Sequence, residues 1–339
     1  MNQISVVGID LAKTVFQIHA VDKNGKMLER KAIRRLKLLS YFANIPPCLI
    51  GMEACSSAHY WARKLEGLGH QVKLMAPQYV KPYVKTNKND ANDAEAICEA
   101  VTRPNMRFVP PKSEEQQALL LIHRERDGIV KERTALINRI RATLGEFGIV
   151  IPVGPRHLHD WFLNNLADAE MQMPEILVQH VMRMKSRLNQ LESDLDVLER
   201  TVNQTSQNSK LCRRLEAVPG IGRLAASAIV ASIGDGKFFA SGRQFSAWLG
   251  LVPKQNSSGG KQRLMGISKR GDGYLRRLLI HGARAVIRHM NPKRPITEWL
   301  TRLICRSHKN VVIVALANKL ARIAWALLTK DVAYREIAA

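Results

Sequence analysis

The first hundred residues alternate between short apolar runs and amphipathic stretches. Residues 4–9, ISVVGI, have the continuous apolar pattern of a buried strand, and residues 15–21 form a second β-rich run. Asp22-Lys23-Asn24-Gly25 is a hairpin signal, so residues 26–33 are predicted to return as a third strand. The same reading predicts further strands at 48–52 and 71–75, and helices at 35–43, 57–68 and 91–101. This order of strands and helices predicts an α/β layer on a mixed sheet.

Pro110-Pro111 ends this region, and long helical patterns follow. Residues 113–147 contain no proline and open with a plausible capping box, and a second helix is predicted from about 174 to 202. Residues 150–160 carry prolines and are predicted to lie near the tip of a turn. Leucines in the second helix recur at spacings of three and four, as in a coiled-coil seam: Leu188, Leu191, Leu195 and Leu198. The seam fits either packing of two helices within one chain or dimerisation.

A polar linker at 204–210 precedes a basic, mostly helical region. Its exception is a loop at 253–271 rich in Gly, Ser, Lys and Arg. We therefore expect three domains: an α/β domain at 1–110, a helical spacer and assembly region at 111–210, and a C-terminal all-α domain at 211–339.

The charge of the chain points to a polyanionic partner. Among 339 residues, 52 are Lys or Arg and 29 are Asp or Glu, which gives 52 − 29 = +23. The three regions carry 16 − 9 = +7, 13 − 14 = −1 and 23 − 6 = +17. Such an excess costs self-repulsion unless a polyanion neutralises it, and nucleic acid is the leading candidate. A solvated basic surface or an anionic membrane partner is the alternative.

The remaining composition narrows the class. Five cysteines form no CxxC pair and no cluster with histidine, which argues against a zinc site or a disulfide framework. The N-terminus lacks the basic segment of a signal peptide, and the apolar run 311–317 is too short to span a membrane. We expect a soluble, cytoplasmic protein with no membrane partner.

Four carboxylates in the first domain are candidate metal ligands. Asp10 and Glu53 end predicted strands, and Asp90 and Asp93 stand three apart at the start of a predicted helix, so both point the same way. Singly, each has an ordinary explanation as a turn former or a helix N-cap. Together they are predicted to converge at one edge of the sheet, where like charges require cations. Two Mg²⁺ ions (or alternatively Mn²⁺) would clamp the attacking and leaving oxygens of a phosphodiester.

Basic residues near these carboxylates are candidate phosphate ligands. Lys81, Lys85 and Lys88 precede Asp90 in the segment PQYVKPYVKTNKND. They would hold a nucleic-acid backbone near the metals, or else belong to an ordinary exposed loop.

A glycine-rich turn in the C-terminal region resembles a helix-hairpin-helix. Pro219-Gly220-Ile221-Gly222 lies between two apolar helical stretches. In such a motif the turn brings backbone N–H groups close to a DNA phosphate, which makes Gly220 and Gly222 candidate contacts. The alternative is a helical packing unit without a ligand.

The loop that follows contains a candidate nucleophile. Ser257 and Ser258 precede Gly259-Gly260, and a serine in a cation-lined loop can approach and attack phosphorus. Most Ser-Ser-Gly-Gly stretches are simply flexible turns. Basic residues flank this loop and begin the next helix, which continues with Arg284 and Arg288 as a basic stripe. The candidate phosphate ligands are Lys254, Lys261, Arg263, Lys269, Arg270, Arg276 and Arg277.

Taken in order, these segments resemble the DEDD transposases of the IS-one-ten family of insertion sequences. The motifs that carry the resemblance nearly span the chain: GIDLAK at 8–13, GMEAC at 51–55, KNDANDAEAI at 88–97, VPGIG at 218–222, FSAWLGLVP at 245–253 and SSGGKQRLMGISKRGDGYLRRLL at 257–279. One departure concerns the Thr-Gly pair that often follows the GMEA-like glutamate. Here Ala54-Cys55-Ser56-Ser57 occupies that place, which puts the subgroup in doubt.

The resemblance implies a fold and a function. It implies an RNase H fold (RuvC-like) N-terminal domain whose Asp10, Glu53, Asp90 and Asp93 bind metal, and it implies that Ser258 is the nucleophile, with Ser257 as the fallback. The two centres would meet between subunits of a homo-oligomer (a dimer or tetramer), with the helical middle making contacts between protomers. A structured guide RNA would select donor and target DNA, as base pairing does in RNA-guided effectors.

The expected function is that of a bacterial, nucleoid-associated transposase that cuts and rejoins DNA at element ends and target. Two alternatives stay open. One is a RuvC-like junction endonuclease that uses metal-activated water alone, and the other is a non-catalytic nucleic-acid-binding protein.

Overall fold

The computed structural model describes residues 3–85, 89–167, 173–290, 295–330 and 332–334. Lys88 lies outside the described residues. The chain divides into two compact units, Met1–Glu114 and Glu115–Ala339, and each is described by itself. The domain boundaries expected from the sequence stay a prediction.

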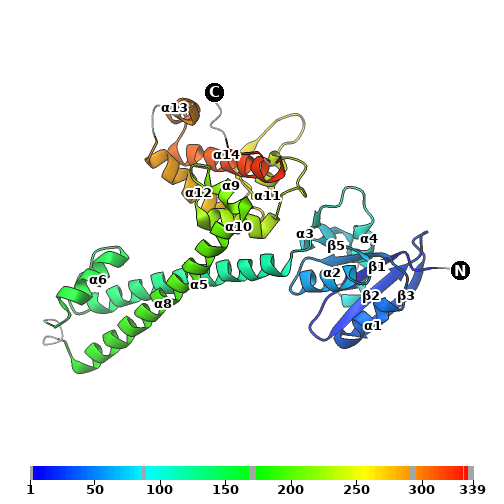
Figure 1. Cartoon of the computed structure of the whole chain (residues 1–339), viewed down its shortest axis with the longest axis horizontal. Coiled ribbons are helices and arrows are strands. Elements are labelled where there is room, and N and C mark those ends of the chain that lie inside the picture. The colour runs from blue at the N-terminus through cyan, green and yellow to red at the C-terminus, as the bar shows by residue number, and fades with distance from the viewer. Residues whose placement is uncertain (1–2, 86–88, 168–172, 291–294, 331, 335–339) are drawn as a thin grey trace. The chain divides into compact units, whose positions relative to one another are not determined.

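The first unit is built on a six-stranded mixed sheet with strand order β3-β2-β1-β4-β5-β6 (Figure 1). Strands β1, β4 and β5 are parallel, while β2, β3 and β6 run antiparallel to their neighbours. The strands are β1 (Val6–Asp10), β2 (Val15–Val21), β3 (Met27–Arg34), β4 (Leu49–Glu53), β5 (Gln71–Met75) and β6 (Phe108–Val109). The helices are η1 (Arg35–Lys37), α1 (Leu38–Ala43), α2 (Ala58–Glu66), α3 (Pro77–Val80), η2 (Lys81–Tyr83) and α4 (Asp90–Val101).

Side-chain alternation divides the strands between two cores. On β1, Val7 and Ile9 join a core that includes residues of α1 and α2, whereas Val6 packs with a core centred on α4. Because successive strand residues face opposite sides, Gly8 and Asp10 share the α4 side with Val6. The end of β1 therefore presents a carboxylate to the face that α4 covers.

The α/β layer predicted from the sequence is confirmed. The five predicted strands appear, and the strand expected at 15–21 has those bounds. The helix predicted at 35–43 is divided into η1 and α1. Strand β6 and the short helix α3 were not predicted, because two and four residues are too few to show a period.

The second unit begins with a long helical hairpin. Helices α5 (Glu114–Gly145) and α8 (Glu175–Asn208) lie side by side, and α6 (Pro155–Asn164) packs with them in one hydrophobic cluster (Figure 1). The predicted leucines Leu188, Leu191 and Leu195 are buried in this cluster with Ile137 and Ile140 of α5. The seam is therefore used for packing within the chain. A coiled coil between chains stays a prediction.

The turn expected at residues 150–160 is only partly right. Helix α6 begins at Pro155 inside that range, because a proline in the first turn has no helical N–H to lose and already has a helical φ.

The rest of the second unit surrounds one large helical core. Its elements are α9 (Lys210–Glu216), α10 (Arg223–Ile233), α11 (Gly242–Trp248), β7 (Pro253–Gln255), β8 (Leu264–Ile267), α12 (Gly273–Arg288), α13 (Pro295–Arg306) and α14 (Lys309–Thr329). By length and mean hydropathy, 1.8 in its most apolar window, α14 is able to cross a membrane. Half of that window is buried, however, and its side chains form much of the core, as in the central helix of a globular unit.

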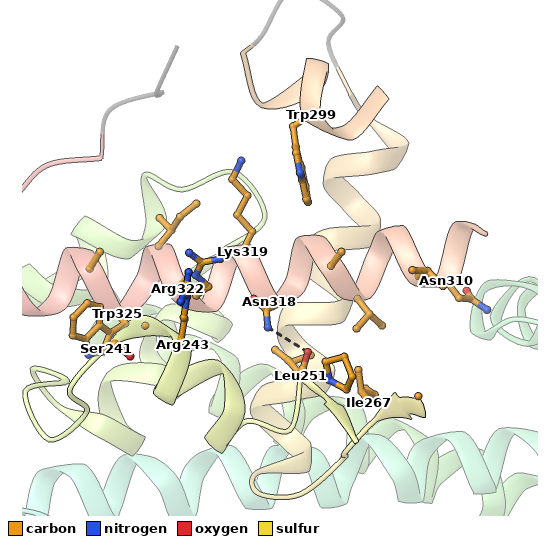
Figure 2. Close-up of a pocket in the computed structure, with 18 of the residues that line it drawn as sticks. Ser241, Arg243, Leu251, Ile267, Trp299, Asn310, Asn318, Lys319, Arg322 and Trp325 are labelled. Carbon is orange, nitrogen blue, oxygen red and sulfur yellow. Dashed lines mark hydrogen bonds between the residues drawn. The ribbon is translucent and has the colours of Figure 1, made fainter. Parts of the chain in front are cut away.

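A cleft of about 1300 Å³ opens in this unit (Figure 2). Residues of α11, α13, α14 and the β7–β8 hairpin line it.

Candidate active site

The parallel pairing of β1 and β4 brings two carboxylates to the same level. Ile9 is in register with Met52, so Asp10 and Glu53 are the next positions on neighbouring strands. By alternation both lie on the α4 side of the sheet. The carboxyl ends of parallel strands thus place this pair at one sheet edge, as the sequence predicts.

Two glycines let α4 approach this face closely. A Cβ on Gly8 would lie 2.2 Å from the carbonyl oxygen of Ala94 and 2.5 Å from the backbone nitrogen of Cys98. A Cβ on Gly51 would lie 2.8 Å from the Cβ of Val101. Gly8 and Gly51 are in register on the two strands, so together they form a groove in which α4 rests. The glycines therefore set the distance between helix and sheet.

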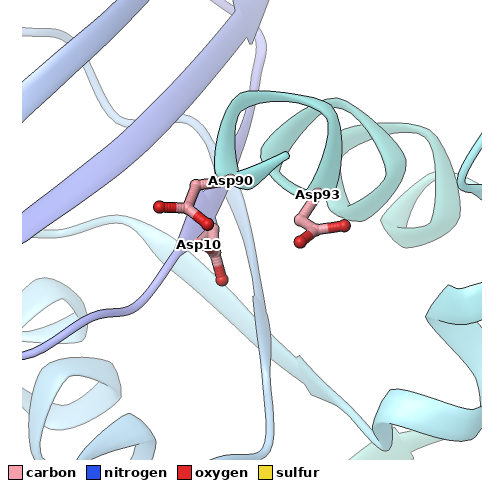
Figure 3. A group of neighbouring side chains, drawn as sticks. All are labelled: Asp10, Asp90 and Asp93. Atoms are coloured by element: carbon pink, nitrogen blue, oxygen red, sulfur yellow. The ribbon is translucent and has the colours of Figure 1, made fainter. Parts of the chain in front are cut away.

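Helix α4 supplies the other two carboxylates from its first turn. The side chain of Asn89 caps the helix by accepting a hydrogen bond from the backbone N–H of Ala91 at 3.0 Å. Asp90 is therefore not the N-cap and does not have the ordinary structural role considered for it. One carboxylate oxygen from each of Asp10, Asp90 and Asp93 lies within 4.8 Å of the other two. Figure 3 shows the three side chains gathered where the start of α4 faces the end of β1.

The cluster has the chemistry of a divalent-cation site. Three crowded carboxylates repel one another, and hard oxygen donors suit Mg²⁺ or Mn²⁺. Among the described residues, no Lys or Arg forms an ion pair with Asp90 or Asp93. Asp10 and Asp93 are half-buried, while Asp90 is exposed to solvent. These three residues fit a metal.

Glu53 does not belong to this tight group, although it lies nearby. Partial burial raises the pKa of the Cys55 thiol, and the negative charges of Glu53 and Asp10 raise it further. Both carboxylates therefore act on the same neighbouring group. The fourth ligand position stays a prediction.

The predicted lysines divide among three situations. The ammonium of Lys85 pairs with Glu95 at 3.4 Å and Glu99 at 3.1 Å, and these contacts raise its pKa. Lys85 is thus tied to the outer part of α4. Lys81 is exposed in η2, and Lys88 falls outside the described residues.

The predicted serine loop is a two-stranded hairpin. Gly259 and Gly260 have φ of +55° and +75°, which is the pattern of a tight two-residue hairpin turn, and the N–H of Lys261 donates to the carbonyl of Ser258 at 3.0 Å. The hydroxyl oxygen of Ser257 accepts hydrogen bonds from the backbone of Arg263 and the side chain of Gln255, at 3.1 and 3.0 Å. Within the described residues the Ser258 hydroxyl makes no such bond, so it is the freer of the two.

The base of this hairpin is fastened to the core. Gly250 and Gly271 have positive φ, and a Cβ on either would meet backbone at about 2 Å: 2.2 Å to the Arg270 oxygen and 1.8 Å to the Trp248 oxygen. One guanidinium nitrogen of Arg276 donates to the carbonyls of Leu249 at 2.9 Å and Arg270 at 3.4 Å. Arg276 therefore holds the loop rather than standing free.

Other predicted phosphate ligands lie on the surface. Lys254, Lys261, Arg263, Lys269 and Arg270 are exposed on or beside the hairpin. Arg277 pairs with Asp127 of α5 and lies over the Tyr274 ring. With His281, Arg284 and Arg288 it forms an exposed face of α12, at spacings of four, three and four.

The glycine-rich turn joins α9 to α10, and its two glycines differ. Gly220 has φ +93° and faces α12, where a Cβ on Gly282 would lie 1.8 Å from the Gly220 oxygen. Gly220 is therefore a packing residue. Gly222 is exposed at the N-terminus of α10, with open space around it.

Several residues that shape these sites were not singled out from the sequence. Gly8 and Gly51 were visible as glycines inside strand patterns, which is the usual mark of a close approach. The cap at Asn89 was hidden by the neighbouring aspartate, which is also a good N-cap.

Comparison with known proteins defines the class. Residues 7–149 match a DEDD transposase family named for IS110 and described as "Transposase", and residues 212–296 match the "Transposase IS116/IS110/IS902 family". A Pseudomonas aeruginosa protein named "Probable family 20 transposase" is 51% identical over 334 residues, covering 98% of this chain and 99% of that protein.

Two named relatives extend this likeness. The "Transposase for insertion sequence element IS1328" of Yersinia enterocolitica is 44% identical over 98% of this chain and 99% of its own length. The "Transposase for insertion sequence element IS1111A" of Coxiella burnetii is 42% identical over 99% of this chain and 92% of its own length. The chain belongs to the IS110/IS116/IS902 family of insertion-sequence transposases, enzymes that cleave and transfer DNA strands. The resemblance noted from the motifs is confirmed.

Proposed function

We propose that this transposase is a two-centre DNA recombinase that joins element ends to target DNA. One centre is the carboxylate site of Asp10, Glu53, Asp90 and Asp93, and the other is Ser258. The convergence of Asp10, Asp90 and Asp93 within 4.8 Å is the observation that carries the proposal. A divalent cation, Mg²⁺ or alternatively Mn²⁺, would stabilise charge on the phosphodiester when bound there.

In this proposal the chain's residues have distinct tasks. Asp10, Asp90 and Asp93 would hold the cation, and Glu53 on the adjacent strand would be a further ligand. The Ser258 oxygen loses its proton and bonds to phosphorus while a bridging P–O bond of the DNA breaks, and the departing oxygen takes up a proton in exchange. The free hydroxyl of Ser258 and the bonded one of Ser257 support this choice between the serines.

Nucleic-acid contacts follow the distribution of charge. The C-terminal region, with 23 − 6 = +17, would carry the DNA or RNA backbone on the exposed lysines and arginines beside the hairpin and along α12. The turn between α9 and α10 would act as a helix-hairpin-helix through the N–H groups near Gly222. The first unit would act as the RuvC-like domain, with Lys81 near the backbone.

Assembly and guidance complete the proposal. A structured guide RNA would choose donor and target, and a dimer or tetramer would bring the two centres together through the helical hairpin, in the bacterial cytoplasm at the nucleoid. Sequencing of RNA that copurifies with the transposase tests guidance, and light scattering of the DNA-bound complex tests assembly. Random cellular RNA in the first, or an active monomer in the second, contradicts that part.

Substitution of the two serines tests the nucleophile. Ser258→Ala should abolish both strand exchange and the covalent protein–DNA adduct, while the matched Ser257→Ala variant keeps the adduct. Loss of strand exchange and of the adduct in Ser257→Ala alone would identify Ser257 as the nucleophile instead. Undiminished strand exchange in both variants would exclude a serine mechanism and favour the endonuclease that uses metal-activated water.

Carboxylate variants test the metal site. Asp10→Asn and Asp93→Asn should lose Mn²⁺ binding in calorimetry and cleavage of element-end DNA. Asp235→Asn, which changes an exposed carboxylate on the second unit, is the control. Intact excision and insertion in the double variant Asp10→Asn, Asp90→Asn would contradict the metal role of the cluster.

A further inference from the structure

The cleft beside the serine hairpin combines an apolar floor with a cationic rim. Leu251, Ile267 and Val314 are among its apolar lining residues, as are Pro253 and Met265 at the base of the hairpin. Arg243, Lys319 and Arg322 also line it. None of the described residues that line the cleft is acidic. The cleft is therefore suited to a group that is apolar on one side and anionic on the other.

The cations are not neutralised within the protein. No ion pair links Arg243, Lys319 or Arg322 to a carboxylate in the described part of the chain. Burial lowers the pKa of Lys319, and the positive charge of Arg322 lowers it further. Lys319 is half-buried and Arg322 is exposed, and two neighbouring cations are stabilised by an anion placed between them. A phosphate is such an anion in a chain of net charge +23.

An indole ring stands beside these cations. The ammonium of Lys319 lies 4.6 Å from the ring centroid of Trp299, and Figure 2 shows the two side chains facing each other at the cleft. The cation–π contact occupies a ring face while no anion is present. A phosphate would draw the ammonium away, and the vacated ring face would then be open to a base.

We propose that this cleft binds an unpaired base of single-stranded DNA, with the base against Trp299 and its phosphate between Lys319 and Arg322. Stacking on an aromatic side chain tolerates every base, because each has a π-face. A paired base cannot enter, since its faces are covered within the duplex. The choice of DNA rests on the proposed function, because the cleft wall continues into the hairpin that carries Ser258.

The cleft would hold a nucleotide of the strand that Ser258 attacks. Extraction of a base from the duplex fixes the backbone beside it, so the cleft would set the register of cleavage. This gives Trp299 a positioning role in the reaction without contact with the reacting atoms.

Binding measurements on the full chain in EDTA test the cleft without chemistry. The probes are labelled oligo(dT) and an abasic deoxyribose-phosphate oligomer of equal length. Wild type should prefer oligo(dT) by about 5- to 100-fold, the usual effect of one stacked base. Trp299→Ala should lose this preference and retain affinity for the abasic oligomer. Trp161→Ala, which alters a half-buried tryptophan of the helical hairpin, should keep the preference.

Photocrosslinking locates the base directly. Single-stranded DNA containing iododeoxyuridine should crosslink to Trp299, and the same sequence in a duplex should not. A crosslink from the matching RNA but not from DNA would overturn the proposal in favour of an RNA site. No crosslink at Trp299, together with an unchanged preference in Trp299→Ala, would overturn it outright. Because no cleavage is measured, these outcomes are independent of the tests of Ser258 and the carboxylates.

Discussion

The spacing between α4 and the sheet makes Gly8→Ala a sharp test of the carboxylate site. The added Cβ would lie 2.2 Å from the Ala94 oxygen, whereas ordinary contact begins near 3.4 Å. The Cβ would thus be 3.4 − 2.2 = 1.2 Å too close to the Ala94 oxygen. Because the clash is between the β1 strand and the backbone of α4, it can be relieved only if α4 moves away from the sheet by roughly 1 Å. Mg²⁺ ligands keep their distances within about 0.2 Å, so Asp90 and Asp93 would leave the site.

We expect Gly8→Ala to lose metal affinity by at least about 10-fold and to cost about 1–3 kcal/mol of unfolding free energy through overpacking. Calorimetric titration with Mn²⁺ and thermal unfolding measure the two effects. Gly51→Ala should do less, because its Cβ would meet one valine side chain, at 2.8 Å. Gly128→Ala, a helical position with open space, is the control. Wild-type metal affinity in folded Gly8→Ala would refute the reasoning.

Three further predictions concern the second unit. Burial lowers the pKa of His123 to about 4 from 6.5, so between these pH values the folded state binds fewer protons than the unfolded state. The free energy of unfolding that depends on neutral His123 is therefore complete above pH 6.5 and falls by about 3 kcal/mol as the pH drops toward 4. Urea unfolding at pH 7 and pH 4.5 should show a smaller loss of stability in His123→Asn than in the wild type. Gly282→Ala should lower the melting temperature strongly, because its Cβ would lie 1.8 Å from the Gly220 oxygen, and an unchanged melting temperature would contradict this close packing. Arg284→Gln should reduce the salt dependence of DNA binding by about one phosphate contact without loss of stability, and equal salt slopes in wild type and variant would exclude that contact. Arg276→Gln should chiefly lower the stability of the fold, because the Arg276 guanidinium donates hydrogen bonds to two backbone carbonyls.

The sheet and the meeting of three carboxylates could be predicted because both follow from local rules. Apolar runs ending in Asp10 and Glu53 predict parallel strands whose ends share an edge, and the spacing of Asp90 and Asp93 places both on one helix face. The sequence did not show how closely α4 packs against the sheet. The distance between helix and sheet depends on the alignment of Gly8 with Gly51, and this alignment is set by the register of β1 and β4.

For the basic residues, the sequence could not predict which side chains are available to bind nucleic acid. A count of charges predicts a polyanion, but it cannot distinguish a free guanidinium from one already in use. The Arg276 guanidinium donates to the backbone carbonyl of Leu249, and the Lys85 ammonium pairs with Glu95 and Glu99. The sequence does not show these contacts, because only folding brings the partners together. The cleft was missed for a similar reason, since Arg243 and Arg322 are 79 positions apart and meet only through tertiary packing.

The serine hairpin has a consequence for control of the enzyme. Every residue from 253 to 266 is exposed, and a two-stranded ribbon of this size has little stability of its own. Its base is clamped by Gly250, Gly271 and Arg276, while its tip has no interior to rest on. The nucleophile proposed there, Ser258, would therefore take its final position only from nucleic acid bound over the hairpin. In that case strand cleavage would wait until the complete protein–nucleic acid complex has formed.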